Sequence, residues 1–202
     1  MSNGFQIMNQ CNITQNRVNS HHAGYITQLI NSDSYITCVN VIENNQSFGN
    51  FNEHMPDSLK SSIFSVTSCN YIRNKSPDSY DGHLIYSSAD TIMSHCFICD
   101  NDIPYIFWAD DCTITFENST TDSDSSEIVG NPPIFENTDD SFENNCPLLT
   151  TDFVGSLNDK CRNSIQNYAE SGVENEENNF YIRNRVKLLY FFMTTKQIKN
   201  SI

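Results

Sequence analysis

Short apolar runs recur along the chain as far as residue 120, separated by clusters of Asn, Ser, Asp and Pro that are typical of turns. Runs of this length predict β-strands, which we place at residues 25–30, 63–66, 84–86 and 103–108. Beyond residue 150 the spacing changes, and apolar side chains recur at three- and four-residue steps. Those residues are Val154, Leu157, Cys161, Ile165 and Tyr168, and their spacing predicts one helix near 156–171.

Five of the eight cysteines begin the same short phrase, in which an apolar strand and then an asparagine follow the cysteine. The cysteines are Cys11, Cys38, Cys69, Cys96 and Cys112, and the asparagines are Asn16, Asn44, Asn74, Asn101 and Asn118. The first four phrases are spaced almost evenly, and the fifth follows the fourth after a much shorter step. Recurrence of this kind predicts a repeat architecture, in which each unit stacks on the next. The last step is too short for a full turn, so we expect two phrases to share one turn.

The phrase suits a parallel β-helix. In a strand, a cysteine and the residue two positions later point to the same face, so both can face the interior. Stacked turns then place a column of cysteine side chains in the core, while asparagine ends each strand at a tight corner and pairs with asparagine in the next turn. An ordinary two-sheet sandwich is the main structural alternative, because short strands at this spacing also build one.

With these phrases, of which Ser68-Cys69-Asn70-Tyr71-Ile72-Arg73-Asn74 is one example, the chain resembles the right-handed parallel β-helix family, also called pectin-lyase-like. Its Asn- and Cys-rich, acidic composition is similar to that of the polymorphic-outer-membrane-protein-like surface proteins of parabasalid protists. The resemblance covers roughly residues 5–120. It implies an extracellular or cell-surface protein without a catalytic site.

Three regions follow from these patterns. Residues 5–120 are expected to form a short right-handed parallel β-helix of the all-β class, with four or five turns. Residues 121–150 are expected to be an acidic, partly disordered segment or degenerate turns, because residues 134–137 echo residues 115–118. Residues 151–202 are expected to form a small C-terminal cap with a helix and a basic tail.

Charge narrows the possible partners. The net charge is −14, and residues 76–159 contain 17 acidic residues and no Lys or Arg. Such a stretch repels nucleic acid, so we expect no nucleic-acid partner.

Residues 1–20 carry no readable signal peptide. The apolar run at 186–193 is too short to span a bilayer, so no membrane span is expected in this chain. We expect the cysteines to be free buried thiols, since a chain of this length does not need a disulfide framework.

Asp110-Asp111 is the sharpest candidate for chemistry, because this pair is similar to the paired aspartates of polygalacturonase-type glycosidases on the same fold. Paired carboxyl groups can place an acid and a base around a glycosidic bond. The other motifs of that family are missing, including its His-Gly pair and its Arg-Ile-Lys triplet. A solvated turn is the plainer explanation of the two aspartates.

Two further clusters are candidates for binding a metal ion, and one aromatic segment is a candidate for contacting a partner. His95, Cys96 and Cys99 have metal-ligand character, but structural zinc needs four ligands, and Cys96 and Cys99 should point to opposite faces of a strand. The acidic run Asp122, Asp124 and Glu127 could bind calcium weakly, yet a solvated loop explains it. We therefore expect no metal and no cofactor. The aromatic segment Tyr105, Phe107 and Trp108 could contact a sugar or a protein from the outside of a turn.

From the sequence we expect a non-catalytic binding or structural protein, whose outer surface contacts a protein or a glycan. The main alternative is a polysaccharide-active glycoside hydrolase or lyase that uses Asp110 and Asp111. A third possibility is that the chain is a fragment of a larger surface protein.

Overall fold

The computed structural model describes residues 5–20, 22–56, 62–76, 82–122 and 128–138, together with residue 146. All of them belong to Met1–Leu148, the first of the two units into which the chain divides. The helix predicted near 156–171, the basic tail and the cap at 151–202 lie outside the described residues.

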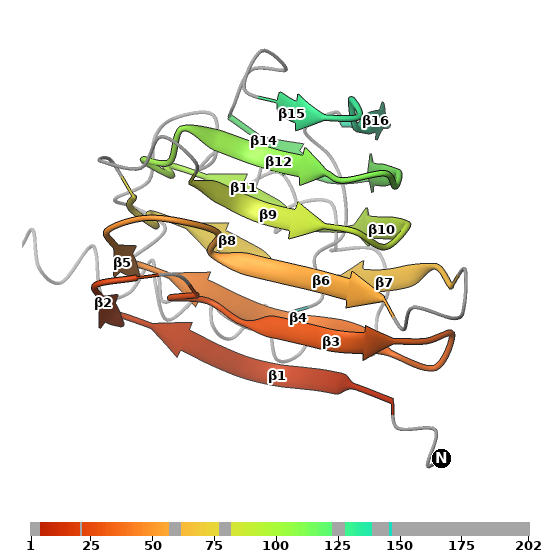
Figure 1. Cartoon of the computed structure of the whole chain (residues 1–202), viewed down its shortest axis with the longest axis horizontal. Coiled ribbons are helices and arrows are strands. Elements are labelled where there is room, and N and C mark those ends of the chain that lie inside the picture. The colour runs from red at the N-terminus through yellow and green to blue at the C-terminus, as the bar shows by residue number, and fades with distance from the viewer. Residues whose placement is uncertain are drawn as a thin grey trace, which may run out of the picture. The chain divides into compact units, whose positions relative to one another are not determined.

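The described residues form a parallel β-solenoid of about four turns (Figure 1). One wall is a nine-stranded sheet with the order β14-β11-β8-β4-β7-β10-β13-β16, to which β1 adds by pairing with β4. Its strands are β1 (Ile7–Thr14), β4 (Tyr35–Ile42), β7 (Phe64–Thr67), β8 (Asn70–Ile72), β10 (Thr91–Ser94), β11 (Phe97–Cys99), β13 (Ile114–Glu117), β14 (Thr120–Thr121) and β16 (Ile134–Glu136).

The opposite wall is a five-stranded sheet with the order β15-β12-β9-β6-β3. It contains β3 (Ile26–Ile30), β6 (Asn52–Pro56), β9 (His83–Ser87), β12 (Tyr105–Ala109) and β15 (Ile128–Gly130). A short pair at one corner joins the two walls, and it consists of β2 (Arg17–Val18) and β5 (Asn45–Gln46).

Every strand pair in the described part is parallel, which excludes the antiparallel sandwich and confirms an all-β parallel solenoid. Equivalent positions in successive turns are Asn12, Asn40, Asn70, Phe97 and Thr120, so the turns are similar in length and the last of them is the shortest. Residues 134–136 extend the nine-stranded sheet, with Phe135 opposite Phe116 and Glu136 opposite Glu117. The similarity between these two segments therefore corresponds to a shared position in the solenoid.

A left-handed residue interrupts the nine-stranded wall at the same place in every turn. The residues are Gln10, Cys38, Ser68, His95, Asn118 and Asn137, with φ between 45° and 57°. A residue in this conformation breaks the in-out alternation of a strand, so inward residues lie three positions apart rather than two. Thus Val66 and Cys69 both face the core, as do Met93 and Cys96.

A second left-handed column makes the corner that follows. Gln15, Glu43, Arg73 and Asp100 have φ between 56° and 58°, and each directly precedes one of the corner asparagines. At a tight corner, asparagine itself could adopt the left-handed conformation. The preceding residue does so instead, which leaves the asparagine side chain to bond along the solenoid axis.

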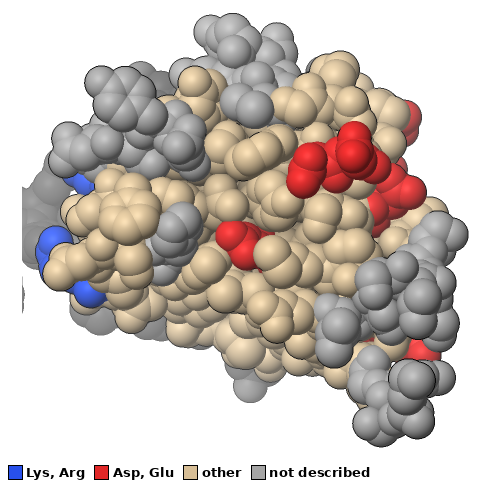
Figure 2. Space-filling model, in the orientation of Figure 1, with Lys and Arg blue, Asp and Glu red and all other residues tan. Residues whose placement is uncertain are grey.

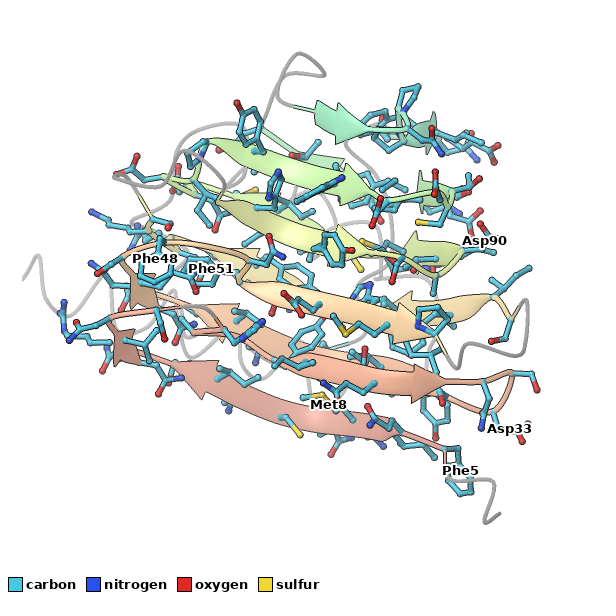
Figure 3. All side chains as sticks on the ribbon, viewed as in Figure 1. Phe5, Met8, Asp33, Phe48, Phe51 and Asp90 are labelled. Carbon is cyan, nitrogen blue, oxygen red and sulfur yellow. A yellow bond between two sulfur atoms is a disulfide. The ribbon has the colours of Figure 1, made fainter. Side chains whose placement is uncertain are left out.

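The space between the walls is filled by aromatic and aliphatic side chains. The largest fully buried ones are Tyr71, Phe64, Phe107, Phe116 and Phe51, of which Phe51 is labelled in Figure 3. Within this core the Tyr25 hydroxyl lies 3.1 Å from Nε2 of His54 and 2.6 Å from the Tyr71 hydroxyl. Complete burial lowers the pKa of His54 to about 3, so its ring is neutral at physiological pH.

Three predictions about the cysteine phrase are wrong. Val39, not Cys38, shares the inward column with Cys11, Cys69 and Cys96, because Cys38 is the left-handed residue of its turn. Cys112 lies at the corner before β13 rather than in that column. Cys38 forms a disulfide with Cys146 (Cα–Cα 5.0 Å) and Cys99 is disulfide-bonded as well, so the cysteines are not all free thiols. Cys11, Cys69, Cys96 and Cys112 are free.

Candidate binding surface

The outer surface of the five-stranded sheet carries a group of aromatic rings and carboxylates that contact one another from strand to strand. This sheet lies in front in Figure 1. Register places Glu53 on β6 opposite Tyr86 on β9, and Tyr86 opposite Trp108 on β12, so these three residues form one row across the sheet. His83 and Tyr105 form a second row beside it. We call Glu53, His83, Tyr86, Tyr105, Trp108 and Asp110 the aromatic face.

The rings of the aromatic face contact one another from strand to strand. The centroid of His83 lies 5.1 Å from that of Tyr105 in a stacked pair and 4.6 Å from that of Trp108. Tyr86 meets Trp108 edge-on at 5.0 Å. Tyr86, Tyr105 and Trp108 are half-buried, so part of each ring reaches solvent. Pairs of this kind hold aromatic surfaces in fixed orientations.

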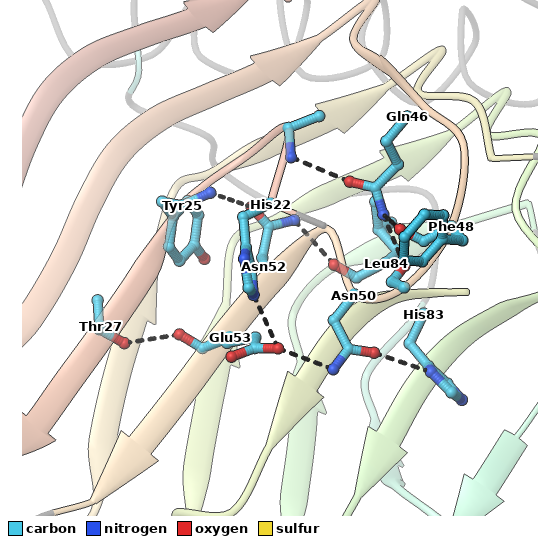
Figure 4. A network of polar contacts seen from close by, with 12 residues as sticks. His22, Tyr25, Thr27, Gln46, Phe48, Asn50, Asn52, Glu53, His83 and Leu84 are labelled. Atoms are coloured by element: carbon cyan, nitrogen blue, oxygen red, sulfur yellow. Dashed lines mark hydrogen bonds and ion pairs between the residues drawn. The ribbon is translucent and has the colours of Figure 1, made fainter. Parts of the chain in front are cut away.

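A polar network fixes the buried end of this face (Figure 4). The Glu53 Oε1 atom lies 2.9 Å from Nε2 of His22 and accepts a hydrogen bond of 2.9 Å from Nδ2 of Asn50. Because Asn50 uses its amide nitrogen there, its Oδ1 accepts from Nδ1 of His83 at 3.1 Å. This assigns the proton of His83 to Nδ1. Glu53 is only 8% exposed, and its carboxylate is held by these contacts.

Asp110 bounds the other end of the face. The Tyr86 hydroxyl donates a hydrogen bond of 2.8 Å to Oδ2 of Asp110. Partial burial, and then the adjacent Asp110 carboxylate, raise the pKa of Tyr86 to about 12. The hydroxyl therefore stays protonated and keeps the exposed carboxylate beside the rings. Asp111 is exposed and left-handed, with φ of 53°, at the turn after β12.

The predicted asparagine ladder runs along one corner and includes four of its five members. The backbone N–H groups of Asn16, Asn44 and Asn74 donate to Oδ1 of the asparagine in the next turn, at 3.0, 3.2 and 3.0 Å. The side-chain amides of Asn44, Asn74 and Asn101 donate to the carbonyls of Ile13, Val41 and Tyr71. Asn118 does not join them, because it lies in the left-handed column of the nine-stranded wall.

A second amide ladder, which we did not predict, lies within that wall. Asn70 donates to Oδ1 of Asn40 at 3.0 Å, and Asn40 donates to Oδ1 of Asn12. Asn40 and Asn70 are buried. Amide ladders of this kind satisfy buried polar groups along the solenoid axis and leave few donors for a ligand.

The candidate metal clusters do not converge in the described part of the chain. Cys96 is in the core, Cys99 is disulfide-bonded, and His95 occupies the left-handed column. Oδ2 of Asp122 accepts a hydrogen bond of 2.8 Å from the backbone of Asp100, while Asp124 and Glu127 lie outside the described residues. No group of three His, Cys, Asp or Glu side chains suited to a metal ion occurs among the residues described.

The cations of the described part gather away from the aromatic face. Arg17, Arg73 and Lys75 are its only Lys and Arg residues, and all three line a surface depression beside β2 and β5. Arg73 lies 3.4 Å from Glu43 and 3.9 Å from Asp100. In Figure 2 the surface over the five-stranded sheet shows red carboxylates, and blue appears at the left edge. Within the described residues, the aromatic face therefore has an acidic environment without Lys or Arg.

The sequence pointed to Trp108, Tyr105 and Asp110 but not to Glu53, His83 and Tyr86. The missed residues do not recur at a fixed spacing, because stretches of unequal length separate Glu53 from Tyr86 and Tyr86 from Trp108. The sequence therefore gave little indication that these residues lie side by side. Phe107, which we grouped with Trp108, points into the core and contacts Phe116 at 5.6 Å.

Comparisons of the chain with protein-family models, with curated proteins and with solved structures find no match. Within the described residues, no helix reaches the length and apolar character that crossing a membrane requires.

Proposed function

We propose that this chain is a non-catalytic binding module whose aromatic face binds a neutral glycan. The observation that carries the proposal is the row formed by Glu53, Tyr86 and Trp108, with Asp110 bonded to Tyr86 at its edge. Half-exposed rings, the exposed Asp110 carboxylate and the largely buried Glu53 carboxylate form a surface of mixed character, apolar in its centre and hydrogen-bonding at its ends.

The two faces of a sugar ring match this character. The C–H groups of a pyranose form an apolar patch that packs on an aromatic ring, while its hydroxyl groups donate hydrogen bonds to carboxylates. Tyr86 and Trp108 are nearly perpendicular, at 84°, so one ring can lie flat against a sugar while the other contacts its edge. The network through Asn50 and His83 holds the site before binding, which reduces the entropy cost of association.

Charge favours a neutral glycan over an acidic one. Glu53 and Asp110 would repel a uronate or sulfate group, and the described cations lie at the β2–β5 corner. A basic peptide is the second candidate ligand, because carboxylates beside aromatic rings also attract cations. The resemblance of the phrases to right-handed β-helix surface proteins supports a role in surface contact or adhesion for either ligand.

The glycosidase alternative rests on Asp110 and Asp111. Asp110 is engaged by the Tyr86 hydroxyl, and we propose that it orients a ligand rather than acting as an acid or base. Release of reducing ends from a polysaccharide, lost in the Asp111→Asn variant, would establish catalysis in place of this proposal.

The test is binding of the full chain to an array of neutral, uronate-containing and sulfated glycans, with a basic peptide as a further probe. We expect a neutral glycan to bind and the Trp108→Ala variant to lose that binding. Tyr35→Ala is the matched control, because Tyr35 is an aromatic residue 38% exposed on the nine-stranded wall. Equal binding by both variants, or preference for the acidic glycans or the peptide, would contradict the proposal.

A further inference from the structure

The strands of the first turn, β1 and β3, each have one edge that forms no pair with another described strand. β1 and β3 each pair along one side, with β4 and β6, and no strand among the described residues pairs with their other side. Met8, labelled in Figure 3, packs against the core with Cys11 and Ile13, yet all three stay partly exposed. The core therefore reaches the surface at β1, where the outer edge of a strand of eight residues meets no other strand of the described part.

The β1 edge carries no charge or proline that would keep another strand away. Residues 5–20 contain a single charged residue, Arg17, and no proline. Phe5 and Ile7 are 58% and 44% exposed beside this edge. Natural sheets protect exposed edges with charged residues or proline, because an unprotected edge pairs with other chains. The composition of β1 favours such pairing.

Apart from the two central residues, the outward Gln10 and the inward Cys11, the order of inward and outward residues in β1 is the same from both ends. Counted toward the middle, the outward, inward and outward residues are Ile7, Met8 and Asn9 from one end, and Thr14, Ile13 and Asn12 from the other. Facing residues of an antiparallel pair lie on the same side of the sheet. If two copies pair antiparallel about the middle of β1, Met8 faces Ile13 of the second copy, and Asn9 faces its Asn12. The inward apolar side chains of the two copies therefore face each other, and so do their outward asparagines.

We propose that two copies of this chain form a symmetric dimer by antiparallel pairing of their β1 strands. Such an interface uses the same patch of both copies and closes on itself, so it yields a dimer rather than a fibre. It covers the exposed parts of Met8, Cys11 and Ile13 and pairs the outer backbone edges of both strands. The two solenoids then share one continuous core.

The charge distribution selects this arrangement over stacking of one copy's first turn on another copy's last turn. Of the described acidic residues, Asp33, Glu43 and Glu53 lie in the first two turns, and the other eight, from Asp90 onward, lie in later turns, away from β1. With a net charge of −14 per chain, two copies repel each other. Joining the two first turns places the acidic ends at opposite poles, which gives the least repulsion.

Sedimentation velocity on the full chain tests the dimer. We expect a species of twice the 23.0 kDa chain mass that dissociates on dilution. The double variant Asn9→Lys/Asn12→Lys should be monomeric, because it brings like charges together across the two-fold axis. The double variant Asn9→Lys/Asn12→Glu should dimerise again, because opposite charges then face each other. The control Ser65→Lys/Thr115→Lys adds two lysines to strands β7 and β13 and should leave the dimer intact.

Cysteine labelling gives a second readout that does not depend on these variants. Cys11 is the one partly exposed residue among the free cysteines of the described part and lies beside the proposed axis. Because the dimer covers Cys11, a maleimide should label this thiol slowly at high protein concentration and faster after dilution to the monomer, and Cys11→Ser should show no such labelling. A monomeric wild-type chain, or a dimer that persists in Asn9→Lys/Asn12→Lys with circular dichroism unchanged, would overturn the proposal.

Discussion

The two walls of the solenoid use their polar side chains in opposite ways. Along the nine-stranded wall and its corner, asparagines bond to asparagines of the next turn, and most of these amides are buried. On the five-stranded wall the polar and aromatic residues change from turn to turn, and several reach solvent. A side chain that recurs in every turn is used by its own neighbours, so the residues that do not repeat are the ones left for a partner.

The largest effect should come from the disulfide at the nine-stranded wall. Cys38 and Cys146 are separated by 108 positions in the sequence, and opening the bond returns conformational freedom to the unfolded chain. We expect Cys38→Ser/Cys146→Ser to lose about 4 kcal/mol of unfolding free energy, measured by urea denaturation without reductant. Serine suits the backbone at position 38, since Ser68 is the left-handed residue of the next turn. A loss no larger than that of Cys11→Ser, a free-thiol control, would contradict this.

Substitutions in the corner asparagine ladder should cause the second-largest loss of unfolding free energy. Asn74 is fully buried, donates to the Val41 carbonyl at 2.8 Å and to Asn101 at 3.0 Å, and accepts from Asn44. Asn74→Ala leaves buried partners unpaired, so we expect a loss of about 3 kcal/mol in the same denaturation experiment. Asn16→Ala, at the exposed end of the ladder, should lose about 1 kcal/mol or less. Equal losses would mean that burial of the ladder contributes nothing.

His54, on the inner side of the five-stranded wall, should make the free energy of unfolding depend on pH. Its pKa is about 3 in the folded chain and about 6.5 when unfolded, so only the unfolded chain takes up this proton between those values. The contribution of the neutral His54 ring to the free energy of unfolding is therefore fully present above pH 6.5. Below pH 6.5 it falls by about 1 kcal/mol per pH unit. His54→Phe should remove that part of the slope, as measured by urea denaturation from pH 7 to pH 4. Identical slopes for the variant and the wild type would contradict the burial of a neutral His54.

The smallest effect on stability should come from the aromatic face. Trp108 is half-buried and lies outside the core cluster. We expect Trp108→Ala to lose about 1 kcal/mol or less, although it should abolish glycan binding. A loss as large as that of Asn74→Ala would mean that both walls hold the fold, and the contrast between them would disappear.

The repeated wall was more predictable than the aromatic face, for a physical reason. Asn16, Asn44, Asn74 and Asn101 follow one another at nearly constant steps because each meets its equivalent one turn away. The cysteine column was only partly predictable, since Cys38 occupies the left-handed position of its turn and the next residue, Val39, takes the inward position. Glu53, Tyr86 and Trp108 share no residue type, and loops of different length separate them, so only the strand register brings them together.

Trp108 is the only tryptophan of the chain, so its fluorescence reports directly on the aromatic face. The most direct test is to titrate the full chain with neutral oligosaccharides and record this emission. A saturable shift that Asp110→Asn weakens and Tyr35→Ala leaves unchanged is the predicted result. Unchanged emission with every neutral oligosaccharide, or an equal shift in the Asp110→Asn variant, would contradict a binding role for this wall.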